Sequence, residues 1–431
     1  MRKKKVYLTL VGDNLNEGHL NLFKIAKNYG DITIGLMTDN ACVEYTSLPH
    51  FSYEYRKNFL IKNLGIRNII PHATLDYTDN LKILKPDFVI HGDDWRKGFL
   101  KKTREKVIKQ LKIWNGKLIE VPYTKNIPYS ENRKQFLQSA TTTEIRKSKL
   151  SRLLKVKRIV KILEAHNPIG GLIIDNLSIN SKKHYDEFDG VWCSSLTDSS
   201  SRGKPDNMSL DLTTRTNWLS EMFEVTSKPV VYDADNGGNV EHLKFVTRRL
   251  EKLGVSAIVI EDKIGIKKNS LFKDQSKTKL DSVAGFSKKI KIIRQNRISD
   301  DFLIIARLES LIVKKGINDA LKRAEEYSKA GADLILIHSK KKKPTEVFKF
   351  AKLFRKSKFY KPLVAVPSTY STVKEKDLIK NGFKLVIYAN HMLRSSYLSM
   401  QLTAQKILKN QRSKETEKDM ISINEIIELI E

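Results

Sequence analysis

The first part of the chain alternates short apolar runs with amphipathic stretches. The apolar runs lie at residues 6–11, 32–37, 68–70, 88–91 and 117–121. Between them, residues 19–29 and 53–64 repeat apolar positions with the spacing of helices that bury one face. Strands that alternate with helices in this way predict a parallel sheet with helices on its faces.

A polar and basic stretch follows, from about residue 124 to 155. Its three consecutive threonines, residues 141–143, can cap a helix that begins near Glu144, because threonine hydroxyls accept hydrogen bonds from the free N–H groups of a helix start. We therefore expect a first domain at residues 1–150, a linker at 151–155 and a second domain at 156–431.

Beyond this boundary the pattern of an apolar run followed by a helical stretch occurs eight times. The runs lie at residues 171–175, 190–194, 230–233, 257–261, 303–307, 334–338, 363–366 and 385–389. Eight strand–helix units over roughly 250 residues are what a closed (β/α)₈ barrel requires. The expected fold class is therefore α/β, with a Rossmann-like N-terminal domain and a C-terminal barrel.

Many of the barrel runs end in a polar or ionisable residue. These residues are Asp175, Ser194, Asp233, Glu261, Arg307 and His338. In a barrel the carboxyl ends of all strands meet at one rim, where active sites are built. Any one of these side chains could cap its own strand, but six together favour a common site.

The composition agrees with two globular domains, because 431 residues, 40% of them apolar, exceed what one core usually serves. The formal charge of +30 is compatible with nucleic-acid binding. However, the 79 Lys and Arg residues are spread over the whole chain, without a zinc finger or an RNA-binding aromatic signature. We therefore expect no nucleic-acid partner and interpret the charge as a general lysine bias.

The chain has only two cysteines, Cys42 and Cys193, which is too few for a disulfide framework or a thiolate zinc cluster. The apolar run at 6–11 leads into Gly12 without a signal-peptide cleavage site, so we interpret it as a strand. No apolar run is long enough to cross a bilayer. These features predict a cytoplasmic protein without membrane contact.

Candidate chemistry gathers at the predicted rim. Three acids there could share a metal ion: Asp233, Asp235 and Glu261. Mg²⁺ typically takes one or two carboxylates together with waters and substrate oxygens. The following segment, residues 267–270, is either a solvated loop or a mobile lid that brings a cation and amide donors onto a phosphoryl group. Arg307 and His338 would add donors to the same group.

Several segments in the same order carry a family resemblance. They include Asp233-Ala234-Asp235-Asn236-Gly237-Gly238 and the stretches 191–196, 205–206, 261–263, 267–270, 306–309, 338–340 and 389–394. Through them, residues 156–431 resemble phosphoenolpyruvate mutase, of the isocitrate lyase/phosphoenolpyruvate mutase superfamily. The resemblance implies a Mg²⁺-dependent isomerase of phosphonate biosynthesis that interconverts phosphoenolpyruvate and phosphonopyruvate.

The same resemblance implies a role for each matching residue. Asp233, Asp235 and Glu261 would lie near Mg²⁺, which would hold the substrate carboxylate and enolate oxygen. The catalytic group would be Asp206, Lys267, Asn269 and Ser194. The substrate pocket would be formed by Trp192, Ser195, Leu196, Ser270, Arg307 and His338. Lys267 would belong to a gating loop, and Asp206 would lie beside the phosphorus as a nucleophile or as an orienting group.

The predicted loop also separates members of the superfamily. Carbon–carbon lyases carry a catalytic cysteine in the equivalent loop, and this loop has none. Phosphonopyruvate hydrolase tends to lack the amide found here at Asn269. Lys267 together with Asn269 therefore favours the mutase, with phosphonopyruvate hydrolase or another superfamily lyase or hydrolase as the alternative. Residues 367–370, Pro-Ser-Thr-Tyr, depart from the family's usual Pro-Thr-x-Tyr.

Residues of about 4–150 resemble a second family. The matching segments are residues 18–21, 35–39, 53–56, 91–95 and 141–146. They are similar to cytidylyltransferases, which transfer a nucleotide to alcohols and phosphonates. The resemblance implies a Rossmann-like nucleotidyltransferase domain with CTP as its substrate. Nucleotide contacts would come from His19, Asp93, Asp94, Thr142, Thr143 and Arg146.

One motif of this second family is altered. The usual His-x-Gly-His is Asn16-Glu17-Gly18-His19 here, so a neutral amide replaces one of two histidines that contact the triphosphate. Loss of a donor weakens the stabilisation of a transition state without necessarily abolishing it. The domain is therefore expected either to transfer a nucleotide or, if degenerate, to bind nucleotide weakly or assist assembly.

The C-terminal end bears on assembly. Barrels of the mutase family exchange a C-terminal helix, and residues 421–430 are amphipathic enough for such a helix. The resemblance therefore implies a homo-oligomer, either a tetramer or a dimer.

Overall fold

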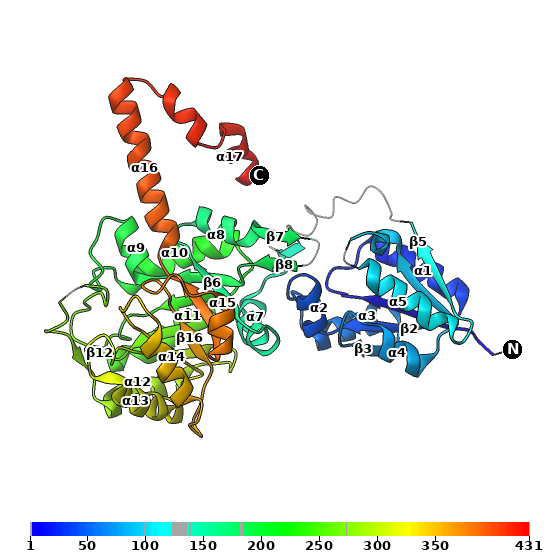
Figure 1. Ribbon diagram of the computed structural model, residues 1–431, viewed down its shortest axis with the longest axis horizontal. Helices are drawn as coiled ribbons and strands as arrows, with labels where there is room; N and C mark the ends of the chain where they lie inside the picture. Colours follow the sequence, from blue (N-terminus) through cyan, green and yellow to red (C-terminus); the bar gives the residue numbers. More distant parts are fainter. Residues whose placement is uncertain are drawn as a thin grey trace.

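Two bodies make up the molecule, a sheet domain and a barrel (Figure 1). The computed structural model describes residues 2–98, 100–122, 136–137, 139–181, 184–272 and 274–430. Helix α7 (Thr143–Val156) lies between the two bodies and contacts both. The predicted α/β fold class, a Rossmann-like domain followed by a barrel, is confirmed.

The N-terminal domain is built on a five-stranded parallel sheet of order β3-β2-β1-β4-β5. Its strands are β1 (Lys5–Leu10), β2 (Asp31–Met37), β3 (Ile69–His72), β4 (Phe88–Gly92) and β5 (Lys117–Val121). Its helices are α1 (Glu17–Tyr29), α2 (Asp39–Tyr45), α3 (Tyr53–Leu64), α4 (Thr78–Leu84), the 3₁₀ turn η1 (Asp93–Arg96) and α5 (Lys101–Lys112). All five predicted strands and both predicted helices are present.

Alternation along the central strand gives this sheet two cores. Val6 and Leu8 of β1 pack into one cluster with residues of α1 and α3, such as Phe23 and Leu60. Tyr7 lies on the opposite face, in a cluster with residues of α4 and α5. Successive strand residues point to opposite faces, so a parallel sheet buried on both sides needs apolar residues at nearly every position.

Helix α7 begins where the threonine cluster predicts. The Thr142 hydroxyl accepts a hydrogen bond from the backbone N–H of Ile145, as an N-cap residue does. Further along, Leu150 and Leu153 pack into the interior of the barrel with Val160. Residues 151–155, predicted as a linker, lie within this helix, so the link between the two bodies is helical.

Polar side chains of α7 fasten both bodies to it. On the barrel side, the Arg146 guanidinium donates to the backbone carbonyls of Thr226, Lys228 and Phe223. On the other side, Arg152 Nε donates to Asp39 Oδ2 at 2.8 Å, and its other nitrogens donate to backbone carbonyls of residues 49–51. The helix therefore holds the sheet domain against the end of the barrel where the strands begin.

Lys149 of α7 is buried at this junction, and Lys149→Met should change how stability depends on pH. Its Nζ donates to the Ser227 carbonyl at 2.8 Å, and burial lowers its pKa to about 7 although Asp175 opposes that shift. An unfolded lysine titrates near pH 10.4, so between about pH 7 and 10 the unfolded chain binds more protons and wild-type stability rises with pH.

The Met variant cannot titrate at this position. We expect its gain in stability from pH 7 to pH 9 to be smaller than the wild-type gain by about 2 kcal/mol, measured by calorimetric unfolding at both pH values. Equal gains in the two proteins would contradict a neutral Lys149 in the folded state.

The C-terminal body is a closed barrel of order β10-β11-β14-β15-β16-β17-β6-β9, with every neighbouring pair parallel. Its strands are β6 (Val160–Glu164), β9 (Gly190–Cys193), β10 (Val230–Asp233), β11 (Ala257–Glu261), β14 (Leu303–Leu308), β15 (Leu334–Ile337), β16 (Leu363–Ala365) and β17 (Phe383–Tyr388). The predicted barrel is confirmed, with one strand placed differently.

The predicted strand at 171–175 is wrong, because these residues belong to helix α8 (Pro168–Asn176). Asn167 caps that helix by accepting from the Gly170 N–H at 2.9 Å, and Pro168 stands in its first turn. The first barrel strand is β6, where Lys161 and Glu164 interrupt the apolar pattern. Asp175 consequently lies away from the rim. Its carboxylate accepts a hydrogen bond from the Thr226 hydroxyl at 2.7 Å.

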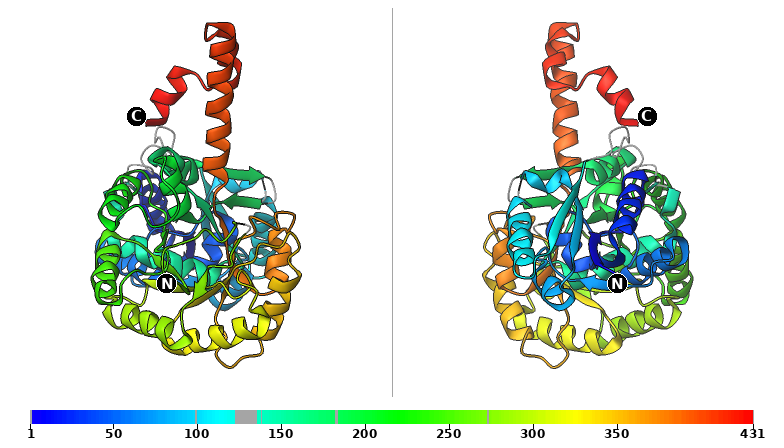
Figure 2. Two further views of the ribbon diagram at one scale, coloured as in Figure 1. Left: turned by 90° about the vertical axis from the view of Figure 1, so that its left-hand side faces the viewer. Right: turned by 90° about the vertical axis from the view of Figure 1, so that its right-hand side faces the viewer.

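Helices cover the outside of the barrel (Figure 2). They are α9 (Ser195–Ser201), α10 (Leu212–Val225), α11 (Val240–Leu253), α12 (Val283–Asn296), α13 (Gly316–Ala330), α14 (Thr345–Phe354) and α15 (Glu375–Lys380), together with α8. Two short hairpins interrupt the pattern, β7 (Ser178–Ser181) with β8 (His184–Glu187) and β12 (Lys263–Ile264) with β13 (Lys279–Leu280). The second hairpin forms the base of the loop that reaches the candidate site.

A C-terminal arm projects from the barrel (Figures 1 and 2). It consists of α16 (His391–Asn410), the 3₁₀ turn η2 (Lys414–Asp419) and α17 (Ile423–Ile430). None of the described residues of α16 is buried. Its large hydrophobic side chains Tyr397 and Met400 are each 63% exposed. Across the described residues, no helix combines the length and the apolar character needed to cross a membrane.

Candidate functional site

Polar residues from neighbouring strands of the barrel meet at one rim. Asp233 and Glu261 are the last residues of β10 and β11, Arg307 lies near the end of β14, and His338 directly follows β15. Arg307 Nη2 lies 2.9 Å from His338 Nδ1 and 3.4 Å from Glu261 Oε2. The structure thus brings together residues that are far apart in sequence.

Lys267 places a cation among the acids of this rim. Its Nζ lies 2.5 Å from Asp235 Oδ1, 2.9 Å from Asp206 Oδ1 and 4.0 Å from Asp233 Oδ2. It also donates to the Ser195 hydroxyl, which in turn donates to Asp233 Oδ2 at 2.8 Å. Burial alone would lower the pKa of Lys267, but the carboxylates raise it above its usual value, so the ammonium stays charged.

The loop that carries Lys267 is closed over the barrel. Asn269 Nδ2 donates to Asp206 Oδ2 at 2.7 Å, so two loop residues meet the same carboxylate. Lys267 and Ser270 are buried, at 7% and 2% exposure. In this structure these loop residues pack onto the site, and the alternative of a solvated loop does not hold for them.

A second network contains Arg307 and His338, the predicted phosphate ligands at the strand ends. The Ser270 hydroxyl donates to Glu309 Oε2 at 2.6 Å and accepts from Arg307 Nη2 at 2.9 Å and Lys263 Nζ at 2.8 Å. His338 Nδ1 lies 3.1 Å from Glu309 Oε1. Burial would raise the pKa of Glu309, but Arg307 and Lys263 hold it well below its usual value.

The three predicted metal ligands differ in their surroundings. Glu261 is buried and pairs with Lys263 and Arg307, but both its carboxylate oxygens lack a partner in hydrogen-bonding geometry among the described residues. Burial raises the pKa of Glu261 to about 7. Burial would also raise the pKa of Asp233, but Lys267, Arg307 and Arg215 lower it to about 2.

This donor set fits Mg²⁺. Within the described part of the chain, no three acidic, histidine or cysteine side chains already converge at metal-binding distance. Mg²⁺ does not require such a cage, because it usually binds one or two carboxylates and completes its octahedron with waters and substrate oxygens. Asp233, Asp235 and the unsatisfied oxygens of Glu261 could hold it in that way.

The remaining predicted pocket residues lie at the junction of β9 and α9. The Trp192 side chain packs in the barrel interior, and its buried indole N–H has no hydrogen-bond partner among the described residues. Ser194 is the N-cap residue of α9, and Leu196 is half-buried in the first turn of that helix. This indole N–H is therefore an unsatisfied buried donor.

Several residues of the site have no assigned role in the sequence prediction. Arg215 of α10 lies 3.5 Å from Asp235 Oδ2 and 3.2 Å from Asp198 Oδ2, and its guanidinium stacks over the Tyr232 ring at 4.4 Å. Because Arg215 lies within a helix, the pattern of strand ends gives no signal for it. Glu309 follows the end of β14 directly, so the same pattern could have found it.

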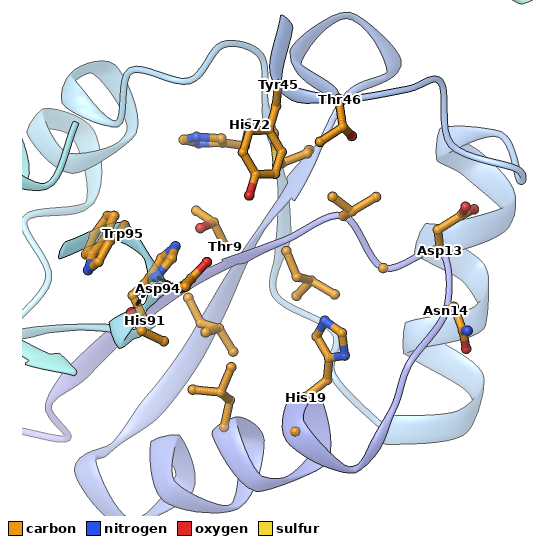
Figure 3. Close-up of a pocket in the computed structure, with 18 of the residues that line it drawn as sticks. Thr9, Asp13, Asn14, His19, Tyr45, Thr46, His72, His91, Asp94 and Trp95 are labelled. Atoms are coloured by element: carbon orange, nitrogen blue, oxygen red, sulfur yellow. Dashed lines mark hydrogen bonds and ion pairs between the residues drawn. The ribbon is translucent and has the colours of Figure 1, made fainter. Parts of the chain in front are cut away.

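The N-terminal domain contains a separate cavity of about 560 Å³ at the carboxyl ends of β1 and β4 (Figure 3). Predicted residues His19 and Asp94 line it, and Figure 3 shows both side chains pointing into it. His91 and Trp95 stack beside Asp94 with ring centroids 3.8 Å apart. This volume suits a small organic ligand.

The other predicted nucleotide ligands lie elsewhere. Asp93, Thr142, Thr143 and Arg146 are not among the described residues that line the cavity. Arg146 is buried against the barrel, where it donates to three backbone carbonyls and stacks on the Phe223 ring at 4.5 Å. The structure therefore gives no support to the expected contact between Arg146 and a nucleotide phosphate.

Comparison with known proteins decides the family. The family model described as phosphoenolpyruvate phosphomutase matches residues 150–408, which is more than half of the chain. The chain belongs to this phosphomutase family. It is therefore an enzyme of the phosphoenolpyruvate mutase/isocitrate lyase superfamily, as the residues of the barrel predict.

Relatives with two different activities, phosphoenolpyruvate phosphomutase and phosphonopyruvate hydrolase, are similar to this chain to nearly the same degree. Phosphoenolpyruvate phosphomutase of Tetrahymena pyriformis is 32% identical over 297 residues, covering 69% of this chain and 93% of the relative. A crystal structure of phosphoenolpyruvate phosphomutase from Streptomyces platensis subsp. rosaceus is 34% identical with a TM-score of 0.60, covering 66% of this chain and 94% of that chain. A phosphonopyruvate hydrolase solved with oxalate and Mg²⁺ is 31% identical with a TM-score of 0.59 and the same coverage.

The N-terminal domain matches a second family model. Residues 13–150 match the model described as cytidylyltransferase-like. This match agrees with the parallel sheet order and with the cavity at its strand ends. The predicted organisation of the chain, with segments of two families, is confirmed.

Proposed function

We propose that the barrel interconverts phosphoenolpyruvate and phosphonopyruvate. The observation that carries the proposal is the meeting of Lys267 and Asn269 at Asp206, beside the acids Asp233 and Asp235. A phosphoryl transfer of this kind needs positioning and positive charge more than covalent chemistry. A cation and an amide carried by one closed loop supply both.

The reaction is an isomerisation, so the atoms of the substrate are rearranged and no water is consumed. The bond between phosphorus and the enol oxygen breaks, and a bond between phosphorus and C3 of the enolate forms. Arg307, His338 and Asn269 hold the phosphoryl group between these two positions. Mg²⁺ near Asp233, Asp235 and Glu261 would supply positive charge for the carboxylate and enolate oxygens.

Asp206 acts as an orienting group in this proposal. Its two oxygens are engaged by Lys267 at 2.9 Å and Asn269 at 2.7 Å, which fixes the carboxylate and keeps the loop over the site. A carboxylate that accepts a hydrogen bond at one oxygen and forms an ion pair at the other is a weaker nucleophile than a free one. The closed loop also excludes water, which favours recapture of the phosphoryl group by carbon over hydrolysis.

Two alternatives from the same superfamily predict different chemistry. A lyase of the cysteine type needs a thiol in the loop, but the loop sequence has none and Cys193 is buried in β9. A phosphonopyruvate hydrolase would need a water near the phosphorus. Asn269 occupies the loop position beside Asp206 and supports the mutase.

Phosphorus NMR of the purified protein with phosphonopyruvate and Mg²⁺ tests the proposal. We expect the phosphonate signal to be replaced by that of phosphoenolpyruvate. Formation of pyruvate and free phosphate would identify a hydrolase instead. An unchanged spectrum, with folding verified by circular dichroism, would reject both activities. A confirmed mutase would place the chain in phosphonate biosynthesis.

The N-terminal domain carries a separate hypothesis, CTP-dependent cytidylyl transfer to a phosphonate. The cytidylyltransferase-like match and the position of His19 in the cavity support it. Incubation with CTP and either hydroxyethylphosphonate or aminoethylphosphonate tests it. Release of pyrophosphate with both substrates present would establish transfer, and its absence would leave the domain without this activity.

The C-terminal arm supports a homo-oligomer. Tyr397, Leu398 and Met400 of α16 are 55–63% exposed, and α17 carries Ile423 at 79%. A second copy of the chain would cover such an apolar arm. Light scattering should give a mass of at least two chains, and truncation after residue 390 should reduce it. A wild-type monomer would contradict this assembly.

A further inference from the structure

Asp235 is held at the rim in an unusual backbone conformation. Its φ is 54°, in the left-handed region that few residues other than glycine occupy. Its N–H donates to Asp233 Oδ1 at 3.1 Å, and its carbonyl accepts from the Glu261 N–H at 2.8 Å. A conformation of this kind persists only where the surroundings fix it. The backbone of Asp235 is therefore tied to the two other predicted metal ligands.

The side chain of Asp235 is fixed by Arg215. Arg215 Nη1 lies 3.5 Å from Asp235 Oδ2, whereas Oδ1 of the same carboxylate lies 2.5 Å from Lys267 Nζ. The contact at Oδ2 limits rotation of the carboxylate and leaves Oδ1 directed toward the rim. Side chains that contact a metal ligand from behind orient it, and their loss typically costs about 10–100-fold in metal affinity.

Arg215 is itself held by a buried acid and a ring. Its Nε lies 3.2 Å from Asp198 Oδ2, and its guanidinium stacks over the Tyr232 ring at 4.4 Å. Arg215 is 5% exposed and Asp198 is 3% exposed. A planar guanidinium can engage two carboxylates with different nitrogens, in a fixed geometry that the single ammonium of a lysine does not reproduce.

The pair of Asp198 and Arg215 also connects the pocket with the metal ligands. Asp198 belongs to α9, the helix that begins at Ser195, and the Ser195 hydroxyl donates to Asp233 Oδ2 at 2.8 Å. Arg215 belongs to α10, and Tyr232 directly precedes Asp233 on β10. The contacts of Arg215 therefore fix two helices and the end of one strand relative to each other.

We propose that Arg215 is a positioning residue of the metal site, which orients Asp235 toward Mg²⁺ while Asp198 holds Arg215 in place. This role rests on the proposed function, because it requires that Asp235 helps to hold Mg²⁺. Arg215 also carries a positive charge near the acids, and removal of that charge would by itself strengthen their attraction for a cation. A test of orientation must therefore keep the charge.

Two charge-conserving variants provide that test. Arg215→Lys keeps the cation without the planar fork, and Asp198→Glu keeps the acid but moves its carboxylate by the length of one methylene. Electron paramagnetic resonance measures free Mn²⁺ during titration of the full chain, and Mn²⁺ is a suitable probe because it prefers the same oxygen ligands as Mg²⁺. We expect Mn²⁺ to bind about tenfold more weakly to each variant than to wild type.

Two results of this titration would overturn the proposal. The first is a Mn²⁺ affinity within about twofold of wild type in the variants, because orientation of a metal ligand should change affinity by more than that. The second is a wild-type chain that binds no Mn²⁺ at millimolar concentration. If one variant does not fold, as judged by circular dichroism, the other decides.

Arg202→Lys is the matched control. Arg202 Nε lies 3.0 Å from Oδ1 of the same Asp198, but the Arg202 side chain is 37% exposed. We expect Mn²⁺ affinity within about twofold of wild type, because exposed ion pairs contribute little. A loss equal to that of Arg215→Lys would overturn the proposal, since any change around Asp198 would then have the same effect.

Turnover separates this role from the proposed function. In Arg215→Lys the Mg²⁺ concentration for half-maximal turnover should rise about tenfold, whereas turnover at saturating Mg²⁺ should stay within about threefold of wild type. A loss that saturating Mg²⁺ does not restore would overturn the proposal and assign Arg215 to the general architecture of the rim. A wild-type chain that binds Mn²⁺ without converting phosphonopyruvate would reject the proposed reaction alone, and the Mn²⁺ titration would still decide the role of Arg215.

Discussion

Lys267→Met is expected to lower kcat/KM for the interconversion of phosphoenolpyruvate and phosphonopyruvate by at least about 10³-fold. The Lys267 ammonium lies 2.5 Å from Asp235, 2.9 Å from Asp206 and 4.0 Å from Asp233. Without it, three carboxylates face the anionic substrate with less compensation, and the loop loses its principal tether to the site. The measurement is steady-state turnover in both directions with Mg²⁺ present.

Lys268→Met provides the matched control for this prediction. Lys268 is the next residue of the same loop, but its side chain is 34% exposed and pairs with Asp274 at 3.0 Å. We expect turnover within about twofold of wild type, because exposed ion pairs contribute little. Equal losses in both variants would show that general loop disorder, and not the position of the Lys267 charge, causes the effect.

The barrel was predictable from sequence because seven of its strands are short apolar runs bounded by helical patterns. The sequence pattern does not identify strand β6. Lys161 and Glu164, the second and last residues of β6, make this strand look polar. Lys161 pairs with Asp186, and the Glu164 carboxylate accepts hydrogen bonds from the backbone N–H groups of residues 392 and 393. Residues 171–175 are apolar because α8 is buried, and a short apolar run does not distinguish a buried helix from a strand.

The site was predictable to the extent that strand ends share a rim. Asp233, Glu261, Arg307 and His338 were found because each follows an apolar run. Their partners were harder to predict, since Arg215 reaches Asp235 from the middle of α10 and no local pattern marks it. Partners of this kind are set by contacts between segments that are distant in the chain, and the sequence pattern does not show these contacts.

The threonine cluster shows the same limit in the N-terminal domain. Thr142 caps α7 as its sequence predicts, because capping is local. The surface that Arg146 contacts depends on how α7 docks, and the helix directs Arg146 toward the carbonyls of residues 223–228. A motif can therefore keep its residues while their partners change.

The position of α7 also separates the two candidate sites. Leu150 and Leu153 enter the barrel at the end where its strands begin, whereas Lys267 and Asp233 lie at the opposite rim. Figure 1 shows β12, at the base of the loop, on the side of the barrel away from the sheet domain. The two candidate sites of one chain therefore lie on opposite sides of α7.

Arg307→Met is expected to affect both activity and stability. The guanidinium joins Glu309 at 2.6 Å, Ser270 at 2.9 Å and Glu261 at 3.4 Å. Its loss leaves buried acids with fewer positive partners, so the free energy of unfolding should fall by roughly 3–5 kcal/mol. Arg307 is also proposed to hold the phosphoryl group. We therefore expect kcat/KM to fall by at least about 10³-fold at a temperature where the variant is folded.

Two further variants separate the two effects of Arg307. Arg294→Met removes a 45% exposed guanidinium that pairs with Asp333 at 3.4 Å, and it should change neither quantity appreciably. Glu309→Gln weakens the same buried network without removing the guanidinium, so it should reduce stability while preserving more of the turnover than Arg307→Met does. If Glu309→Gln and Arg307→Met lost turnover equally, Arg307 would act through the architecture of the rim and not as a ligand of the phosphoryl group.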